Sequence, residues 1–270
     1  MCASNPTPAT VSWIGARHAP GTLRSRLICL PHAGGGAGTF RSWRPHLPDG
    51  VELAPVELPG RGSRIDEPLP QSFDTLVDAL FEGLRGEFTL PYAFFGHSFG
   101  ALLGYELTRR IEREIEREIE REIERGAGLR PPSVLLVSGS RAPHVPLDGE
   151  PVADGDEARL VAWLRSSGGL PDELLDFPDF LRDLLRAVRS DMAFAEGYRI
   201  PRPAAVGCPL VAFAGAEDAV SPVAHVAPWN LYTTAEHRMH VLPGGHYFPQ
   251  SHPRTTVTAV AEELAALSAR

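Results

Sequence analysis

The chain has 270 residues, of which 43% are hydrophobic and 22% are charged, and this composition suits one α/β domain of ordinary size with a full core. Its formal net charge of −8 argues against a nucleic-acid-binding protein. The three cysteines are scattered and form no C-x-x-C pair, which argues against a zinc site or a disulfide framework. There is neither a signal-peptide pattern nor an apolar run of about 18 residues, so we expect a cytoplasmic protein with no membrane partner.

The first part of the chain predicts two buried strands separated by a glycine-rich loop. Residues 1–20 are polar and predict a loose arm with a short strand near 11–13. Short apolar runs at residues 26–30 and 51–56 predict the two buried strands. The sequence Pro-His-Ala-Gly-Gly-Gly-Ala-Gly at residues 31–38 matches neither a P-loop nor a dinucleotide-binding fingerprint. Its glycines allow backbone N–H groups to face a substrate oxygen; the alternative is a flexible loop without function.

A serine between two glycines follows the third predicted strand. Helices are predicted at residues 39–47 and 72–88, and the apolar run 92–95 predicts a strand leading into Gly-His-Ser-Phe-Gly at residues 96–100. A helical pattern comes next, which is the context of a nucleophile elbow with Ser98 at its apex. In such an elbow the backbones approach closely and the serine is strained, so side chains at the flanking glycines would clash. The alternative is a glycine-rich turn with an incidental serine, and the flanking strand and helix favour the elbow.

The helix predicted after Ser98 ends in an Ile-Glu-Arg-Glu repeat. It spans residues 101–125, or about 37 Å, which is longer than a helix packed on a sheet needs. A four-residue repeat drifts by about 40° per repeat around a helix, so the isoleucines of residues 111–125 cannot all join one buried stripe. We therefore expect the last turns to project into solvent, and deletion of three repeats to leave turnover unchanged. The alternative is a contact between residues 111–125 and a partner or a second copy of the chain.

The rest of the chain continues the alternation of strands and helices. Apolar runs predict strands at residues 133–137, 210–214 and 237–242, and an amphipathic pattern predicts a closing helix at 253–270. Alternating strands and helices are typical of a sheet whose strands run parallel and whose two faces are covered by helices. The predicted fold class is therefore α/β, with a mostly parallel central sheet flanked by helices.

A helical insertion interrupts this alternation. Helices are predicted at residues 156–164 and 179–198, separated by Gly-Gly-Leu-Pro at 168–171. The glycine and proline hinge and the many apolar side chains predict a lid over the site, and such a lid implies an acyl-like substrate. The alternative is that these side chains only pack on the sheet. The predicted organisation is a core in residues 1–143, which include the projecting helix 101–125, a lid in 144–203 and the rest of the core in 204–270.

A serine nucleophile needs a base to accept its proton, and that base needs an anionic carboxylate to orient it. In α/β-hydrolases the chain order is Ser, Asp, His, and the last two lie in loops after late strands. Asp218 and His246 have these positions, each in a loop that contains glycine. Glu217 is the main alternative to Asp218 as the carboxylate of the triad, and Asp191, within the insertion, is a weaker alternative. His97 is only the variable position of the elbow, and the other histidines considered are interpreted as loop or surface residues: His32, His144, His225, His237, His240 and His252.

Six motifs resemble, in sequence and in order, those of the type II thioesterases of polyketide and non-ribosomal peptide assembly lines, within the α/β-hydrolase superfamily. The resemblance runs from about Leu27 to the C-terminus. Two features depart from it: Phe99 follows the serine where methionine is also common, and the Ile-Glu-Arg-Glu repeat has no counterpart. The motifs are Pro-His-Ala-Gly-Gly at 31–35, Leu-Pro-Gly-Arg-Gly at 58–62, Gly-His-Ser-Phe-Gly at 96–100, Ser-Gly-Ser-Arg-Ala-Pro at 138–143, Gly-Ala-Glu-Asp at 215–218 and Gly-Gly-His-Tyr-Phe at 244–248.

The resemblance implies an α/β-hydrolase fold with a helical lid insertion. It implies a serine hydrolase that cleaves acyl thioesters from the phosphopantetheine arm of acyl or peptidyl carrier proteins and so edits stalled or misprimed assembly lines. Ser98 would be the nucleophile, His246 the base and Asp218 its partner, with the backbone N–H groups of Ala33 and Phe99 as the oxyanion hole. No cofactor and no metal is expected, because the pantetheine belongs to the substrate. The expected partner is a carrier protein, and the expected form is a monomer.

Two alternatives remain open from the sequence. One is a free-standing carboxylesterase or lipase that uses the same triad on an oxygen ester. The other is a non-catalytic protein of hydrolase-like fold, with the lid and the projecting helix as contact surfaces; the complete triad argues against it.

Overall fold

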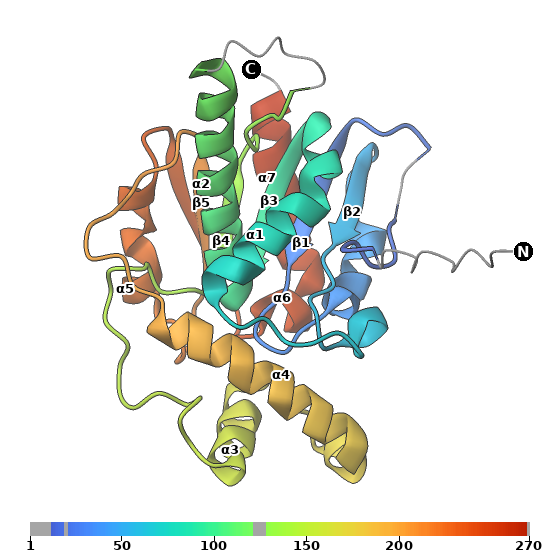
Figure 1. The fold of residues 1–270 in the computed structure, drawn as a ribbon, viewed down its shortest axis with the longest axis vertical. Helices are drawn as coiled ribbons and strands as arrows, with labels where there is room; N and C mark the ends of the chain where they lie inside the picture. The colour runs from blue at the N-terminus through green and yellow to red at the C-terminus, as the bar shows by residue number, and fades with distance from the viewer. Residues whose placement is uncertain (1–11, 19–20, 121–127, 269–270) are drawn as a thin grey trace, which may run out of the picture.

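A single parallel sheet forms the centre of the computed structural model, which describes residues 12–18, 21–120 and 128–268 (Figure 1). All five pairings between neighbouring strands of this sheet are parallel, and the strand order is β2-β1-β3-β4-β5-β6. The predicted α/β class with a mostly parallel sheet is confirmed. The strands are β1 (Ser25–Leu30), β2 (Val51–Pro55), β3 (Tyr92–His97), β4 (Leu135–Ser138), β5 (Leu210–Gly215) and β6 (His237–Leu242).

The strands read as continuous apolar runs because both faces of the sheet are covered. Successive side chains of a strand point to opposite faces. In β1, Leu27 and Cys29 join one hydrophobic cluster, and Ile28 and Leu30 join the other. The elements packed on the first face are α1 (Phe73–Leu84), α2 (Phe99–Glu120), α5 (Val223–Val226) and η5 (Ala227–Tyr232), and those on the second are η1 (Ala37–His46), α6 (Phe248–Ser251) and α7 (Pro253–Ser268).

The strand order places a topological switch between β1 and β3. The chain moves from β1 outward to β2, and then from β3 in the other direction through β4, β5 and β6. In open parallel sheets, ligands bind beside the carboxyl ends of the strands at such a point. The loop after β1 and the turn after β3 both lie there, so the glycine-rich loop and Ser98 are neighbours in space.

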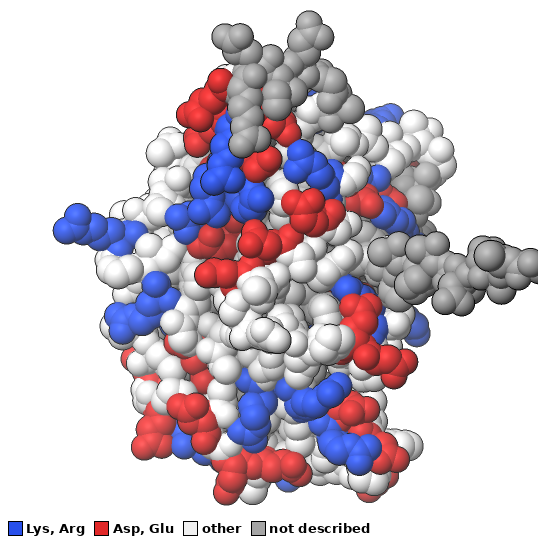
Figure 2. Space-filling model, viewed as in Figure 1, with Lys and Arg blue, Asp and Glu red and all other residues white. Residues whose placement is uncertain are grey.

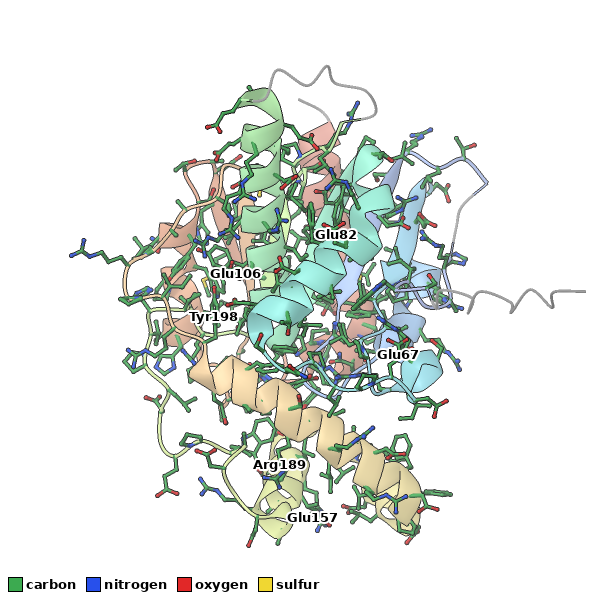
Figure 3. The ribbon with its side chains drawn as sticks, viewed as in Figure 1. Glu67, Glu82, Glu106, Glu157, Arg189 and Tyr198 are labelled. Atoms are coloured by element: carbon green, nitrogen blue, oxygen red, sulfur yellow. The ribbon has the colours of Figure 1, made fainter. Side chains whose placement is uncertain are left out.

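The helical insertion lies across this same edge of the sheet (Figure 1). It contains α3 (Glu157–Ser167), η4 (Asp172–Asp176) and α4 (Pro178–Gly197). Within it, Arg189 on α4 donates to the carbonyl oxygens of Ala153 and Gly155, which lie before α3. At the end of α4, Tyr198 donates to Glu106 of α2, and Figure 3 shows these two side chains side by side. The insertion is therefore attached to the core beyond its chain connections.

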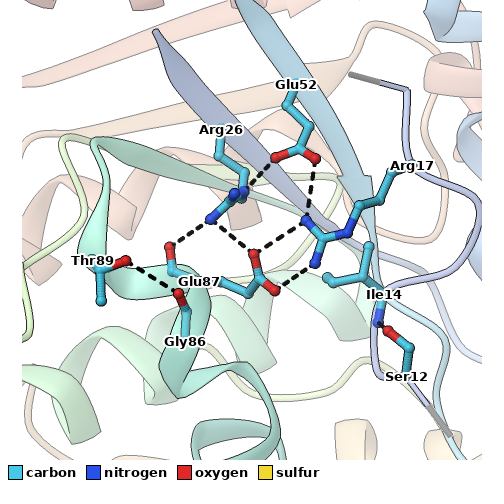
Figure 4. A network of polar contacts seen from close by, with 8 residues as sticks. All are labelled: Ser12, Ile14, Arg17, Arg26, Glu52, Gly86, Glu87 and Thr89. Atoms are coloured by element: carbon cyan, nitrogen blue, oxygen red, sulfur yellow. Dashed lines mark hydrogen bonds and ion pairs between the residues drawn. The ribbon is translucent and has the colours of Figure 1, made fainter. Parts of the chain in front are cut away.

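A network of four paired charges holds the amino-terminal segment against the opposite end of the sheet (Figure 4). Arg26 at the start of β1 pairs with Glu52 at 2.5 Å and with Glu87 at 2.8 Å. Arg17 pairs with the same two carboxylates. Arg26 and Glu52 are buried, and buried charges are tolerated only when they are paired in this way.

Three predicted elements differ from those observed. The helix expected at residues 39–47 is the 3₁₀ helix η1, which has Pro45 inside it. The helix expected at 72–88 ends at Leu84 and continues as a 3₁₀ turn, η3 (Arg85–Thr89). The short strand expected near 11–13 falls partly outside the described residues, and two isolated bridges in this region join Ile14 to Val56 and His18 to Leu53. These are differences of helix type and strand position, and they leave the layers unchanged.

The repeat of α2 passes gradually from the core into solvent. Ile111 is fully buried, Ile115 is partly buried against the core and Ile119 is 56% exposed, as the drift around the helix requires; Ile123 lies outside the described residues. Charged side chains of both signs gather over this end of α2 (Figure 2). Glu112 accepts a hydrogen bond from the Gly207 amide, and Arg85 pairs with Glu118. The first repeats therefore belong to the domain, and deleting three of them would remove these contacts. None of the described helices could span a membrane.

We predict that the isoleucines of the repeat contribute unequally to stability. Ile111→Ala should lower the free energy of unfolding by about 2–5 kcal/mol, because it leaves a cavity in a packed core. Ile119→Ala should change it by less than about 0.5 kcal/mol, because its side chain is mostly in water. Urea unfolding followed by circular dichroism measures both, and equal effects of the two substitutions would contradict the graded burial.

Candidate active site

Ser98 occupies a strained turn between β3 and α2. Its φ of 54° makes it the only non-glycine residue with a positive φ among those the structure describes. A Cβ at Gly96 would lie 2.2 Å from the Gly100 carbonyl oxygen, and a Cβ at Gly100 would lie 2.1 Å from the Leu30 carbonyl oxygen. The Ser98 amide donates to the Ser138 carbonyl at 2.7 Å. The two glycines thus let α2 start directly against the ends of β1 and β3.

Ser98, His246 and Asp218 form one hydrogen-bonded chain. His246 Nε2 lies 3.1 Å from Ser98 Oγ, and His246 Nδ1 lies 2.9 Å from Asp218 Oδ2. Asp218 Oδ1 accepts from the amides of Val220 and Ser221, both at 2.8 Å. A carboxylate at Nδ1 keeps the proton on that nitrogen, so Nε2 can accept the serine proton. The geometry thus suits general-base activation of Ser98.

The two other candidate acids lie elsewhere. Glu217 is exposed and accepts a hydrogen bond from the Gly244 amide. Asp191 is fully buried, accepts from the Gly34 amide at 2.8 Å and pairs with Arg61. Of the three carboxylates, Asp218 is the one bonded to the His246 ring.

Of the two residues expected to form an oxyanion hole, Phe99 lies within the elbow and Ala33 lies in the loop after β1. Ala33 lies in the loop after β1 (residues 31–37, which ends at the first residue of η1), three residues beyond Leu30, whose carbonyl lies against Gly100. Phe99 is the first residue of α2, so its amide is at the positive end of the helix dipole. Both are buried. Their N–H groups therefore belong to two backbone segments that lie close together, the loop after β1 and the start of α2.

Two cavities lie beside these residues, and the insertion supplies part of both walls. Trp163 of α3 and Met192 of α4 line both of them. The cavity of about 70 Å³ at Ser98 has an apolar wall of Phe99, Leu102, Trp163 and Met192. The cavity of about 440 Å³ at His246 includes the polar side chains Arg141, Asp148, Glu150, Glu196, Glu217 and His225. Ser98 thus lines the smaller cavity, whose wall is mainly apolar, and His246 lines the larger, mixed one; Arg141 and Glu196 border both.

Two further histidines, His97 and His32, lie beside His246, and the sequence motifs predict a role for neither. His97 is fully buried, with Nδ1 3.1 Å from Ser138 Oγ and its ring centroid 5.2 Å from that of His246. Burial, and then the neighbouring His246 and His32, hold the pKa of His97 well below its ordinary value. Burial lowers the pKa of His32 to about 3. Both rings are therefore neutral at physiological pH.

The family of the chain follows from comparison with known proteins. The thioesterase domain family matches residues 25–267. The chain belongs to the thioesterase domain family. The described residues contain no group of three or more His, Cys, Asp or Glu side chains that could hold a metal ion. Membership of the thioesterase domain family supports thioester hydrolysis as the activity of the chain.

Individual relatives of this thioesterase cover most of its length. It is 35% identical to the thioesterase PikA5 of Streptomyces venezuelae, over 87% of this chain and 79% of that protein. It is 33% identical to a protein named linear gramicidin dehydrogenase LgrE, of Brevibacillus parabrevis, over 88% of this chain and 87% of that protein. Among solved structures it is similar to the type II thioesterase BorB from the borrelidin biosynthetic cluster, with 31% identity, coverage of 92% and 95% and a TM-score of 0.77. The predicted resemblance and the α/β-hydrolase fold are confirmed.

We predict that His97 makes the thioesterase less stable in mild acid. Its pKa is depressed in the folded state, so below about pH 6.5 the unfolded chain binds a proton that the folded chain does not. The free energy of unfolding should therefore fall with falling pH, by at most about 1.4 kcal/mol per pH unit for this one proton. In His97→Asn the slope between pH 6.5 and pH 5 should be shallower by up to that amount. Urea unfolding at several pH values measures it, and equal slopes would refute the prediction.

Proposed function

We propose that this thioesterase hydrolyses acyl thioesters on the phosphopantetheine arm of acyl or peptidyl carrier proteins, and that it edits assembly lines by removing stalled or wrongly primed acyl groups. The observation that carries the proposal is the chain of hydrogen bonds from Ser98 through His246 to Asp218, of 3.1 Å and 2.9 Å, beside an apolar cavity. The names of relatives such as PikA5 and BorB support the thioester and the biosynthetic setting.

The proposed reaction has two steps, and His246 moves the proton in both. Ser98 Oγ attacks the thioester carbonyl while His246 Nε2 takes its proton, and Asp218 stabilises the imidazolium that forms. The backbone N–H groups of Ala33 and Phe99 stabilise the oxyanion, each lowering the barrier by about 3–4 kcal/mol. The C–S bond breaks, and His246 returns the proton to the pantetheine sulfur. Water, activated by His246, then cleaves the acyl-Ser98 ester and releases the carboxylic acid.

The two cavities fit the two parts of such a substrate. The apolar cavity at Ser98 would take the acyl chain, whose burial is favourable at about 0.8 kcal/mol per methylene. The larger cavity at His246, with amide-compatible polar side chains, would take the pantetheine arm. Neither step of the reaction uses a cofactor or a metal ion, so we propose that the thioesterase needs none.

We predict a clear hierarchy among variants of the site. Ser98→Ala, His246→Ala and Asp218→Asn should each lower kcat by about three orders of magnitude or more, because each removes a member of one acting unit. Glu217→Gln should change kcat by less than about threefold, because glutamine can still accept from the Gly244 amide. Release of thiol from an acyl-carrier protein gives the rates. A larger loss in Glu217→Gln than in Asp218→Asn would reverse the assignment of the acid.

A carboxylesterase with the same triad is the main alternative, and the choice of acyl donor separates the two. We predict a higher kcat/KM for an acyl-carrier protein than for a p-nitrophenyl ester of the same acyl group, because only the former fills both cavities. A panel from short to long acyl chains on the same carrier protein defines the preferred acyl group. A strong preference for the p-nitrophenyl ester at every chain length would favour the carboxylesterase.

A dehydrogenase, the activity stated in the name of LgrE, is less favoured. The loop after β1 lacks the dinucleotide-binding fingerprint, and the imidazole of His246 is hydrogen-bonded to a serine in an elbow. These are the features of acyl transfer rather than of hydride transfer.

A further inference from the structure

We propose that Asp191, on helix α4 of the insertion, is a positioning residue for the oxyanion hole. It would act through the Gly34 amide on the loop after β1, here called the oxyanion loop (residues 31–37), with Arg61 neutralising its charge. The proposal rests on the proposed serine chemistry at Ser98. It does not depend on whether the natural acyl donor is a carrier protein. The insertion would then help to build the catalytic site as well as cover it.

The geometry of Asp191 links three parts of the chain. Its Oδ2 accepts from the Gly34 amide at 2.8 Å and from Arg61 Nη1 at 2.5 Å, and its Oδ1 accepts from Arg61 Nη2 at 3.0 Å. Gly34 is the residue directly after Ala33, whose N–H group is a proposed oxyanion donor. Because neighbouring peptide planes share one Cα atom, fixing the Gly34 amide restricts the plane that carries the Ala33 donor.

Arg61 and Glu57 extend this support along the oxyanion loop. Arg61 Nε donates to the Pro59 carbonyl at 3.3 Å and Nη1 to the Gly35 carbonyl at 3.4 Å, so the guanidinium is bonded to the loop as well as to Asp191. Glu57 accepts from the Ala37 amide at 3.2 Å. Two parts of the chain therefore hold the oxyanion loop in place. One is the segment after β2, which includes the Leu-Pro-Gly-Arg-Gly motif, and the other is Asp191 of the insertion.

The charge of Asp191 makes Arg61 necessary. A bare carboxylate this close to the loop would repel the oxyanion that the loop must stabilise. In a buried site such repulsion is strong, and so is the cost of leaving the carboxylate unpaired. The bidentate pair with Arg61 cancels the charge, and Oδ2 accepts from the Gly34 amide as well as from Arg61 Nη1. A carboxylate with its own guanidinium thus supplies an acceptor without supplying a net charge.

Steric contacts show that α4 sits directly on the oxyanion loop. Gly34 has a φ of 75°, and a Cβ built on it would lie 2.2 Å from Val188 Cγ2 of α4. Val188 is one turn before Asp191, so both residues face the loop. The position of α4 and the conformation of the loop are consequently coupled through one glycine.

The test compares Asp191→Asn with Asp191→Leu, which are of similar size. Asparagine can place its carbonyl oxygen at the position of Oδ2 and keep the Gly34 bond, whereas leucine cannot accept a hydrogen bond. In p-nitrophenyl ester hydrolysis, Asp191→Leu should lower kcat by about 10–100-fold, as expected for a misplaced donor, with KM changed by less than about threefold. Asp191→Asn should recover most of the lost kcat.

An alkylboronic acid gives a second measurement that a general loss of packing would not mimic. Its tetrahedral adduct with Ser98 places an oxygen in the oxyanion hole, so Asp191→Leu should weaken its inhibition by the same factor by which kcat falls. Arg189→Leu is the matched control: this residue is on the same helix, its hydrogen bonds to described residues lie within the insertion, and it is labelled there in Figure 3. It should leave both quantities within about twofold.

Three results would overturn the proposal: an unchanged kcat in Asp191→Leu, an equal loss in Asp191→Asn, or an equal loss in Arg189→Leu. If Asp191→Leu does not fold, Arg61→Gln takes its place, with a loss of kcat of at least about tenfold expected and an unchanged kcat contradicting the proposal. Ester hydrolysis and boronate binding report on Ser98 alone. If the predicted effects on ester hydrolysis and boronate binding are found but the enzyme does not hydrolyse an acyl-carrier protein, the proposed function is rejected. The proposed role of Asp191 would still stand.

Discussion

The close crossing of two backbone segments determines the whole site. Gly100, at the start of α2, lies so near the Leu30 carbonyl at the end of β1 that no side chain fits between them. Beside this contact Ser98 adopts its left-handed conformation, and the α2 amino terminus lies next to the loop after β1. The positions of the proposed nucleophile and of the two proposed oxyanion donors, Ala33 and Phe99, all depend on the close contact between Gly100 and Leu30. The strain at Ser98 is supported by the paired strands β1, β3 and β4 beneath it.

Around this crossing the fold separates buried carboxylates by giving each its own partners. Asp218 has His246 on one oxygen and two backbone amides on the other. Asp191 has Arg61 and the Gly34 amide. Glu57 is bonded to the Ala37 amide, and burial raises its pKa. Of these three carboxylates, Asp218 is the one bonded to the His246 imidazole, so each has its own partners.

Much of this arrangement could be predicted from local sequence patterns. The buried strands are apolar runs, the elbow is a serine between two glycines, and Asp218 and His246 follow late strands; the structure brings these three residues together. The partners of Asp191 could not be predicted, because Gly34 and Arg61 are distant in sequence and meet only when α4 docks on the sheet edge. The sequence indicates Asp191 only as a weaker candidate for the carboxylate of the triad. His97 was missed for a similar reason: its burial beside His246 is a tertiary effect, and an elbow motif carries no signal for it.

The central claim is that Ser98 is the nucleophile for a carrier-bound acyl group. Labelling with a fluorophosphonate, followed by peptide mass mapping, tests it most directly when the reaction is run with and without a saturating acyl-carrier protein. The account predicts a single phosphonylated residue, Ser98, and slower labelling when the acyl-carrier protein is present. Labelling at another residue, or a rate that the acyl-carrier protein does not change, would contradict it.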